Sequence, residues 1–200
     1  FNKLNMIKTI IFDFAWVLTL SKCFPKIAEN LWNQYKLDPN IIMKSLYSSE
    51  SNYVLWKETT ESFYNNSCKH LGISFKDFSY QFQNWYILEE NVLNYIKILK
   101  ENYEIVLHSD NFDILAKVLK INPKLTSIFD LMVFSNDIWY NKTQKEAFLY
   151  TLNRINKKTN ECIFIDDKEK NLIAPYELWI QAILYTSFEK FKIDLEKFIT

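Results

Sequence analysis

Glycine is almost absent from this chain, which has a single glycine, Gly72, among 200 residues. Ordinary usage of about 7% would give about fourteen. Glycine is the residue that enters left-handed backbone conformations at no steric cost, so proteins place it in tight turns. Bulkier residues must therefore occupy positions where such turns are needed.

A long hydrophobic run is also missing. The longest candidate, 7–20, is interrupted by Lys8 and Asp13, and spanning a bilayer takes about 18 or more apolar residues. The amino terminus lacks the charged-then-apolar layout of a secretory signal. The cysteines are three in number, with no close pair typical of a zinc site or a redox motif: Cys23, Cys68 and Cys162. These absences predict a cytoplasmic protein with free thiols and no membrane partner.

Neither sign of charge dominates, because 24 basic residues balance 24 acidic ones. The lysines are scattered along the chain instead of forming a basic cluster. A protein that binds nucleic acid usually carries a basic excess or a basic face, so we expect no nucleic-acid partner. The hydrophobic fraction of 48% is that of a globular protein.

Short apolar runs that are rich in β-branched and aromatic residues alternate with helical patterns. Such runs are typical of strands buried on both faces of a parallel sheet. The predicted strands are 9–12, 105–107, 131–134, 162–165 and 182–185. Apolar residues at helical spacing lie between them, in the groups Val92, Ile96, Leu99; Ile114, Leu115, Val118, Leu119; and Ala147, Phe148, Thr151, Leu152, Ile155. The alternation predicts an α/β fold with a doubly wound, Rossmann-like parallel sheet.

The segment 20–86 has a different pattern. It contains amphipathic stretches, such as the one through Leu31 and Tyr35, but no convincing strand. We therefore predict a small all-helical domain at 20–86, inserted into an α/β core formed by 1–19 and 87–200.

Polar residues follow several of the predicted strands at the point where each strand ends. They are Asp13, Ser109, Lys142 and the pair Asp166-Asp167. Parallel strands bring their carboxyl ends to one edge of the sheet, where ligands of such sheets bind. Carboxylates can hold Mg²⁺, a lysine and a hydroxyl can hold phosphate oxygens, and a carboxylate can attack phosphorus.

In this arrangement the chain resembles the haloacid dehalogenase-like (HAD) hydrolases. Residues 10–18, Ile-Ile-Phe-Asp-Phe-Ala-Trp-Val-Leu, resemble the family's first motif, and 105–109 resemble the second. Lys142 occupies the place of the family's lysine, and 163–167 followed by Asn171 resembles the fourth motif. The ordered set covers nearly the whole chain.

The resemblance implies a Mg²⁺-dependent phosphatase that acts on a small phosphate ester. Separately from the resemblance, we expect a monomer or weak homodimer. Asp13 would be the nucleophile and a metal ligand, with the Ala15 carbonyl oxygen and Asp166 as further ligands and Asp167 in support. Ser109 and Lys142 would hold the phosphoryl group, and the helical domain would close over the site as a cap. The residues expected to contact the substrate are Phe14, Ala15, Trp16, Ser109, Asp110 and Lys142.

Two departures from the family pattern keep other functions open. Ala15 replaces the family's general acid and base, a group that contributes about 10²–10⁴-fold, and Asp110 replaces an asparagine. A phosphate- or partner-binding pseudoenzyme is therefore an alternative. A haloacid dehalogenase is a further alternative, which the pair Asp166-Asp167 disfavours. We expect His108 to be a strand residue packed against a helix and not a base.

Four of the six tryptophans stand where the family has glycine: Trp16, Trp56, Trp139 and Trp179. Some bacteria read the UGA codon as glycine, and a table that reads UGA as tryptophan would produce this pattern. We hypothesise that these positions are glycine in the living protein. If they are tryptophan, we expect a damaged loop at position 16 and low activity.

Overall fold

The structure is a computed structural model that describes residues 7–55 and 57–199. Five strands form one sheet with the order β3-β2-β1-β4-β5, and every neighbouring pair is parallel. The strands are β1 (Thr9–Phe12), β2 (Glu104–Ser109), β3 (Leu131–Phe134), β4 (Cys162–Asp166) and β5 (Gln181–Leu184). The predicted doubly wound α/β sheet is confirmed, and the strand positions agree with the apolar runs to within two residues.

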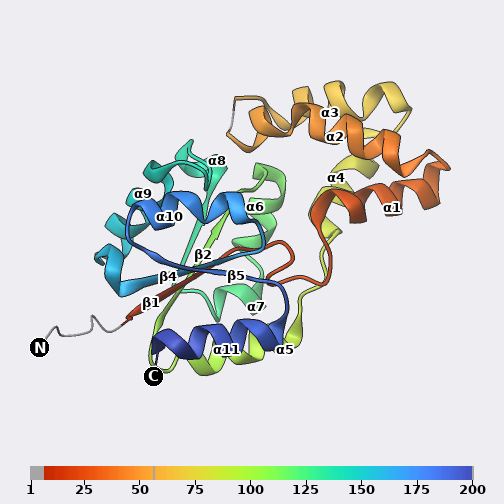
Figure 1. Ribbon diagram of the computed structural model, residues 1–200. Helices are drawn as coiled ribbons and strands as arrows, with labels where there is room; N and C mark the ends of the chain where they lie inside the picture. The colour runs from red at the N-terminus through yellow and green to blue at the C-terminus, as the bar shows by residue number, and fades with distance from the viewer. Residues whose placement is uncertain (1–6, 56, 200) are drawn as a thin grey trace, which may run out of the picture.

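Helices connect the strands (Figure 1). Between β1 and β2, the described residues form helices and no further strand of the sheet. The α-helices are α1 (Cys23–Tyr35), α2 (Pro39–Val54), α3 (Thr60–Ser67), α4 (Phe75–Asn84), α5 (Glu90–Leu99), α6 (Asp113–Leu119), α7 (Pro123–Thr126), α8 (Ser135–Ile138), α9 (Lys145–Ile155), α10 (Ile173–Glu177) and α11 (Phe188–Ile199). The described residues also form three short 3₁₀ helices: η1 (Lys69–Leu71), η2 (Thr159–Glu161) and η3 (Glu169–Asn171).

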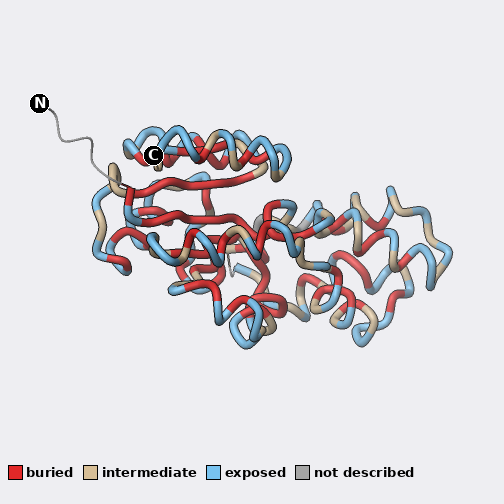
Figure 2. The backbone as a smooth tube through the Cα atoms, turned by 90° about the horizontal axis from the view of Figure 1, so that it is seen from below, coloured by how far each residue is buried: buried red, intermediate tan, exposed pale blue. Residues whose placement is uncertain are grey.

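Side-chain alternation along the buried strands divides the core into two layers. In β1, Ile10 and Phe12 belong to a cluster that includes residues of α5 and α11, whereas Ile11 packs with residues of α9 and α10. Successive residues of a strand point to opposite faces, so both faces of a fully buried strand must be apolar. The helices thus cover both sides of the sheet (Figure 1), and Figure 2 shows the strands buried along their length.

The register aligns the carboxyl ends of the central strands. Phe12, the last residue of β1, pairs with Leu107 of β2 and Ile165 of β4. The chain builds the sheet outward from β1 through β2 to β3 and then returns to place β4 on the other side of β1. This reversal of strand order creates the crevice at which ligands of such sheets bind.

The helical segment joins the sheet through two stretches of chain that run side by side. The backbone N–H of Leu20 donates to the carbonyl of Ile87 at 3.0 Å, and that of Glu89 donates to the carbonyl of Leu18 at 2.9 Å. Thr19 and Leu88 form an antiparallel bridge between them. Helices α1–α4 lie beyond this bridge, beside the carboxyl edge of the sheet (Figure 1).

A second connection fixes the helical segment to the start of α6. The Asp113 carboxylate accepts hydrogen bonds from the Tyr53 hydroxyl at 2.8 Å and the Thr60 hydroxyl at 2.6 Å. Phe112 stacks on Tyr53 with ring centroids 4.9 Å apart and on Phe24 at 5.6 Å. These hydrogen bonds and stacked rings attach the helical segment to the start of α6.

The described residues include no helix with the length and apolar character needed to cross a membrane. Cys23, Cys68 and Cys162 are free thiols.

Candidate active site

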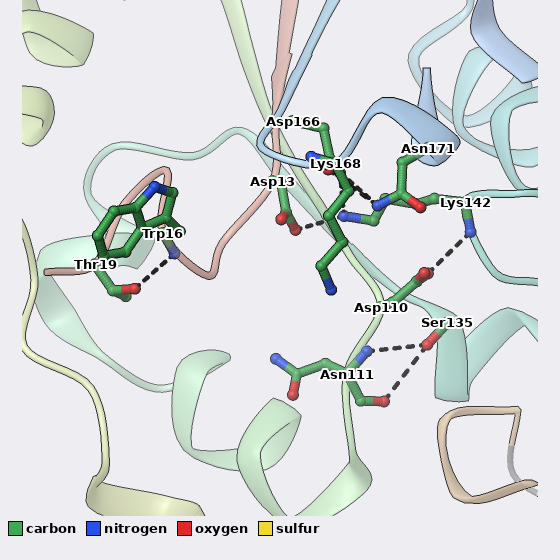
Figure 3. Close-up of polar contacts among 10 residues, drawn as sticks. All are labelled: Asp13, Trp16, Thr19, Asp110, Asn111, Ser135, Lys142, Asp166, Lys168 and Asn171. Atoms are coloured by element: carbon green, nitrogen blue, oxygen red, sulfur yellow. Dashed lines mark hydrogen bonds and ion pairs between the residues drawn. The ribbon is translucent and has the colours of Figure 1, made fainter. Parts of the chain in front are cut away.

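Side chains from three neighbouring strands meet at the carboxyl edge of the sheet. Asp13 directly follows β1, Ser109 ends β2 and Asp166 ends β4. Lys142 comes from the loop between α8 and α9. Figure 3 shows Asp13, Lys142 and Asp166 converging on one point from these different elements.

Lys142 is the centre of this cluster. Its Nζ lies 2.6 Å from Oδ1 of Asp13 and 2.5 Å from Oδ2 of Asp166. All three residues are buried. Because a charge in the interior is costly unless it is paired, the lysine and the two carboxylates depend on each other.

Asp166 is held rigidly by further donors. Its Oδ1 accepts the backbone N–H of Lys168 at 2.8 Å, and both of its oxygens accept from Nδ2 of Asn171 at 3.0 Å. The turn through η3 brings the side chain of Asn171 within hydrogen-bonding distance of the Asp166 carboxylate. This set of donors fixes the direction in which Asp166 presents its remaining lone pairs.

Burial dominates the electrostatics of the cluster. It raises the pKa of Asp13 to about 7, against the lowering effect of Lys142, and the nearby Asp166 carboxylate adds to the rise. Burial opposes the charged form of Lys142, but Asp13 and Asp166 outweigh it and raise the lysine pKa above its usual range. The site therefore holds more negative charge than the lysine alone can compensate.

A divalent cation would supply the missing positive charge. Asp13, Asp166 and Asp167 each offer a carboxylate oxygen, and these atoms lie within 4.8 Å of one another. Both side-chain oxygens of Asp167 are buried without a hydrogen-bond partner among the described residues, although Lys22 Nζ lies 3.1 Å from Oδ2. Buried acceptors are normally satisfied. A hard cation that prefers oxygen ligands, such as Mg²⁺, fits this set.

The loop after Asp13 contains a strained residue. Trp16 has a φ of 67°, in the left-handed region, and its backbone N–H donates to Oγ1 of Thr19 at 2.9 Å. Its side chain is 39% exposed, and Nζ of Lys22 lies 5.5 Å from the ring centroid. For a bulky side chain this backbone conformation is a genuine outlier.

The same conformation recurs at two more of the four tryptophans for which we hypothesise glycine in the living protein. Trp139 has a φ of 68° and Trp179 has a φ of 63°, and their side chains are 63% and 82% exposed. Trp56 lies outside the described residues. The glycine hypothesis stays a prediction, but three of its four positions have the backbone that glycine prefers.

Two adjoining cavities open at the cluster. The larger one has a volume of about 250 Å³ and the smaller one about 150 Å³. Ser109 and Asp167 line the larger cavity, whereas Asp13 and Lys142 line the smaller one. Among the described residues, five line both cavities: Ala15, Glu50, Asp110, Lys168 and Lys170. Glu50 belongs to α2, so the helical segment forms part of the wall.

Comparison with known proteins gives matches among solved structures only, since no family model and no curated protein sequence matches the chain. The HAD family enzyme bt-2542 from Bacteroides thetaiotaomicron superposes with a TM-score of 0.76 over 95% of this chain and 98% of its own, at 20% identity. The chain has the haloacid dehalogenase-like fold. The enzyme bt-2542 has also been solved in a complex with magnesium and inorganic phosphate.

Two other HAD-like structures show the breadth of the likeness. A protein described as a predicted HAD-like family hydrolase from Porphyromonas gingivalis has a TM-score of 0.72 over 96% of this chain and 97% of its own, at 18% identity. L-2-haloacid dehalogenase from Xanthobacter autotrophicus, with chloropropionic acid covalently bound, has a TM-score of 0.70 over 96% of this chain and 83% of its own, at 12% identity. At sequence identities this low, the similarity shows that the chain shares the HAD-like fold and nothing more specific.

The HAD-like fold brings most of the residues expected to form the site to one place. Phe14 and Ala15 line the larger cavity with Ser109 and Asp110. Trp16 lines neither of the two cavities, and its ring stands apart from the carboxylates in Figure 3.

Asp110 is turned toward the lysine loop. Its Oδ1 accepts the backbone N–H of Lys142 at 3.0 Å. Burial raises the pKa of the Asp110 carboxyl, while Lys142 opposes the rise. A carboxyl of raised pKa carries less negative charge than an ordinary aspartate, which reduces its repulsion of a phosphate in the same cavity.

Sequence reasoning missed four charged residues among the described residues that line the two cavities. They are Lys22, Glu50, Lys168 and Lys170, all of which line the larger cavity. Lys168 had the clearest signal, because it directly follows the pair Asp166-Asp167, and its side chain extends toward the open space in Figure 3. Glu50 lies far from every motif in the sequence and had none.

Proposed function

We propose that this protein is a Mg²⁺-dependent phosphatase of a small phosphorylated metabolite that reacts through an aspartyl-phosphate on Asp13. The observation that carries the proposal is the buried cluster of Asp13, Lys142 and Asp166, together with Asp167, whose side-chain oxygens accept no hydrogen bond among the described residues. The HAD-like fold, and a HAD family enzyme of that fold solved with magnesium and inorganic phosphate, support it.

The residues have the following roles in this proposal. Asp13 attacks phosphorus, because it is the carboxylate at the end of the central strand and lines the smaller cavity. Lys142 holds a phosphoryl oxygen and favours the ionised form of Asp13. Ser109 donates its hydroxyl to another phosphoryl oxygen from the wall of the larger cavity.

Asp13, Asp166 and the Ala15 carbonyl oxygen would hold Mg²⁺, with Asp167 in support. The ion would neutralise charge on the phosphoryl group in the transition state. The proposed cap, 20–86, covers the site and restricts the substrate to a small molecule, since the two cavities measure about 250 and 150 Å³. Pockets for drug-sized ligands begin at about 300 Å³.

The test is an assay of phosphate release from sugar phosphates and an aryl phosphate, with and without Mg²⁺. The protein would carry glycine at 16, 56, 139 and 179, and the Asp13→Asn variant is the matched control because it keeps the shape of the side chain. We expect Mg²⁺-dependent release that the control lacks.

Other outcomes would contradict the proposal. If the folded protein releases no phosphate from any substrate of the panel, the pseudoenzyme is favoured. The alanine at position 15, which cannot act as an acid, already argues for that alternative. Halide release from 2-haloacids without metal would favour a dehalogenase instead.

A further inference from the structure

Departure of an alkoxide from phosphorus needs a proton, and the loop after the nucleophile offers none. The two residues after Asp13 are Phe14 and Ala15, and neither side chain can donate or accept a proton. Ala15 nevertheless lines both cavities. A proton donor from another element that lines the same cavities would share this space.

Glu50 is a carboxyl group that lines both of these cavities. It belongs to α2 of the helical segment and shares both cavities with Ala15. Across the described part of the chain, neither a hydrogen bond nor a salt bridge involves its carboxyl group, so the group is available to a ligand. The charged groups that face it are Lys168, Lys170 and Asp110.

The surroundings of Glu50 suit a proton carrier. Burial raises its pKa, the ammonium groups of Lys168 and Lys170 oppose that rise, and Asp110 adds to it. A carboxyl group with a raised pKa stays protonated to a higher pH, nearer to neutrality, and a general acid must be protonated before it can act.

The other carboxyl groups at the cavities are already engaged. Asp110 accepts the backbone N–H of Lys142, and Asp167 is paired with Lys22. Asp13 and Asp166 contact the Nζ of Lys142. Among the described residues that line both cavities, Glu50 is the one carboxyl group without such a partner.

We propose that Glu50, supplied by helix α2, is the general acid and base of the reaction. This inference rests on the proposed phosphatase function and adds a catalytic residue to it. In the first step a bond forms between an Asp13 oxygen and phosphorus, the bond from phosphorus to the leaving oxygen breaks, and Glu50 gives its proton to that oxygen.

The second step returns the enzyme to its starting state. Glu50, now a carboxylate, takes a proton from a water molecule whose oxygen bonds to phosphorus. The bond between phosphorus and Asp13 breaks, and inorganic phosphate leaves. The sum of the two steps is a phosphate ester and water converted to an alcohol and phosphate, with Asp13 ionised and Glu50 protonated again.

The test compares Glu50→Gln with the unsubstituted enzyme on 4-nitrophenyl phosphate and on an alkyl phosphate. With the aryl phosphate, whose leaving group needs no proton, we expect a burst of about one equivalent of nitrophenol followed by turnover that is about 10²-fold slower. With the alkyl phosphate we expect no burst and a loss of at least the same size. Glu61→Gln, at an exposed carboxylate of α3, is the matched control and should behave as the unsubstituted enzyme.

A rescue variant makes the test independent of any structural damage. Adding Ala15→Asp to Glu50→Gln places a carboxyl group in the same cavities at position 15 and should restore turnover at least tenfold. Equal turnover by Glu50→Gln and the unsubstituted enzyme on both substrates would overturn the proposal. A burst in Asp110→Asn but not in Glu50→Gln would also overturn it, in favour of Asp110. Failure of the phosphatase function itself looks different, because then no protein in the series releases nitrophenol or becomes phosphorylated.

Discussion

The Nζ of Lys142 lies 2.6 Å from Oδ1 of Asp13, and this ion pair is buried. A buried charge that loses its partner costs far more than a surface charge, typically about 3–5 kcal/mol. The pair therefore contributes to the stability of the fold as well as to the proposed chemistry. Substitutions measured in the absence of metal report the contribution to stability, and Mg²⁺-dependent measurements report the contribution to the proposed site.

Lys142→Met should lower the free energy of unfolding by about 3 kcal/mol in the absence of metal, because it leaves Asp13 and Asp166 facing each other in the interior. Urea unfolding with EDTA measures the change. Lys145→Met is the matched control, since Lys145 forms an exposed pair with Glu177, and it should change the value by less than about 1 kcal/mol. Equal effects of the two substitutions would contradict a central role for Lys142.

Mg²⁺ should raise the melting temperature, because an ion held by the native carboxylates stabilises the folded state. At a concentration one hundred times the dissociation constant the gain is about 2.7 kcal/mol. Differential scanning fluorimetry measures the shift with and without EDTA. Asp166→Asn should abolish it, whereas Asp137→Asn, at an exposed carboxylate outside the cluster, should retain it. A shift that survives Asp166→Asn would place the ion elsewhere.

His108 should make the protein less stable in acid. Burial lowers its pKa to about 3, and Lys142 adds to the lowering. The unfolded chain takes up a proton near pH 6.5, so between pH 6.5 and 3 it binds more protons than the native state and stability falls as pH falls. The expected contribution is about 1.4 kcal/mol per pH unit.

The contribution is measured as the difference between the parent protein and His108→Leu, since the titration of Asp13 is common to both. The variant should show a shallower loss of stability below pH 6.5 in urea unfolding at several pH values. His70→Gln, at an exposed histidine, is the control and should follow the parent. Parallel curves for His108→Leu and the parent would show that His108 is charged in the native state.

Trp179→Gly should stabilise the protein by about 1 kcal/mol, because the residue has a φ of 63° and an 82% exposed side chain. A left-handed conformation costs an L-residue about 1–2 kcal/mol, and little apolar contact is lost. Trp32→Gly is the matched control. Trp32 is 42% exposed in helix α1, where glycine should destabilise by about 1 kcal/mol.

The gene itself tests the hypothesis behind that substitution. UGA codons at 16, 56, 139 and 179, with UGG at Trp32 and Trp85, would support glycine in the living protein. UGG at the first four positions would refute it.

The strands were predictable because each is a continuous apolar run that ends at a polar residue. The run at 9–12 followed by Asp13 shows this, since β1 is buried on both faces and its next residue enters the site. Chain order and the rule for parallel sheets were then enough to bring Asp13, Ser109 and Asp166 to one edge.

Contacts between the sheet and the helical segment were not predictable. The bond from the Tyr53 hydroxyl to Asp113 joins residues 60 positions apart, and no local pattern marks either partner. The same is true of Glu50, because nothing in the sequence of its helix indicates that the fold places it in the lining of the same cavities as Ala15. Periodicity reports which face of a helix is apolar, but it does not report what the polar face meets.

The paired stretches at 18–20 and 87–89 have a consequence for how this protein could be rebuilt. Directly opposite residues of antiparallel strands stand about 4.5–5.5 Å apart, so the bridge between Thr19 and Leu88 holds the two ends of the insertion almost in contact. A two-residue hairpin turn could close that gap. The sheet and its carboxyl edge can thus be joined to helical insertions of other lengths, or to none, without changing the path of β1.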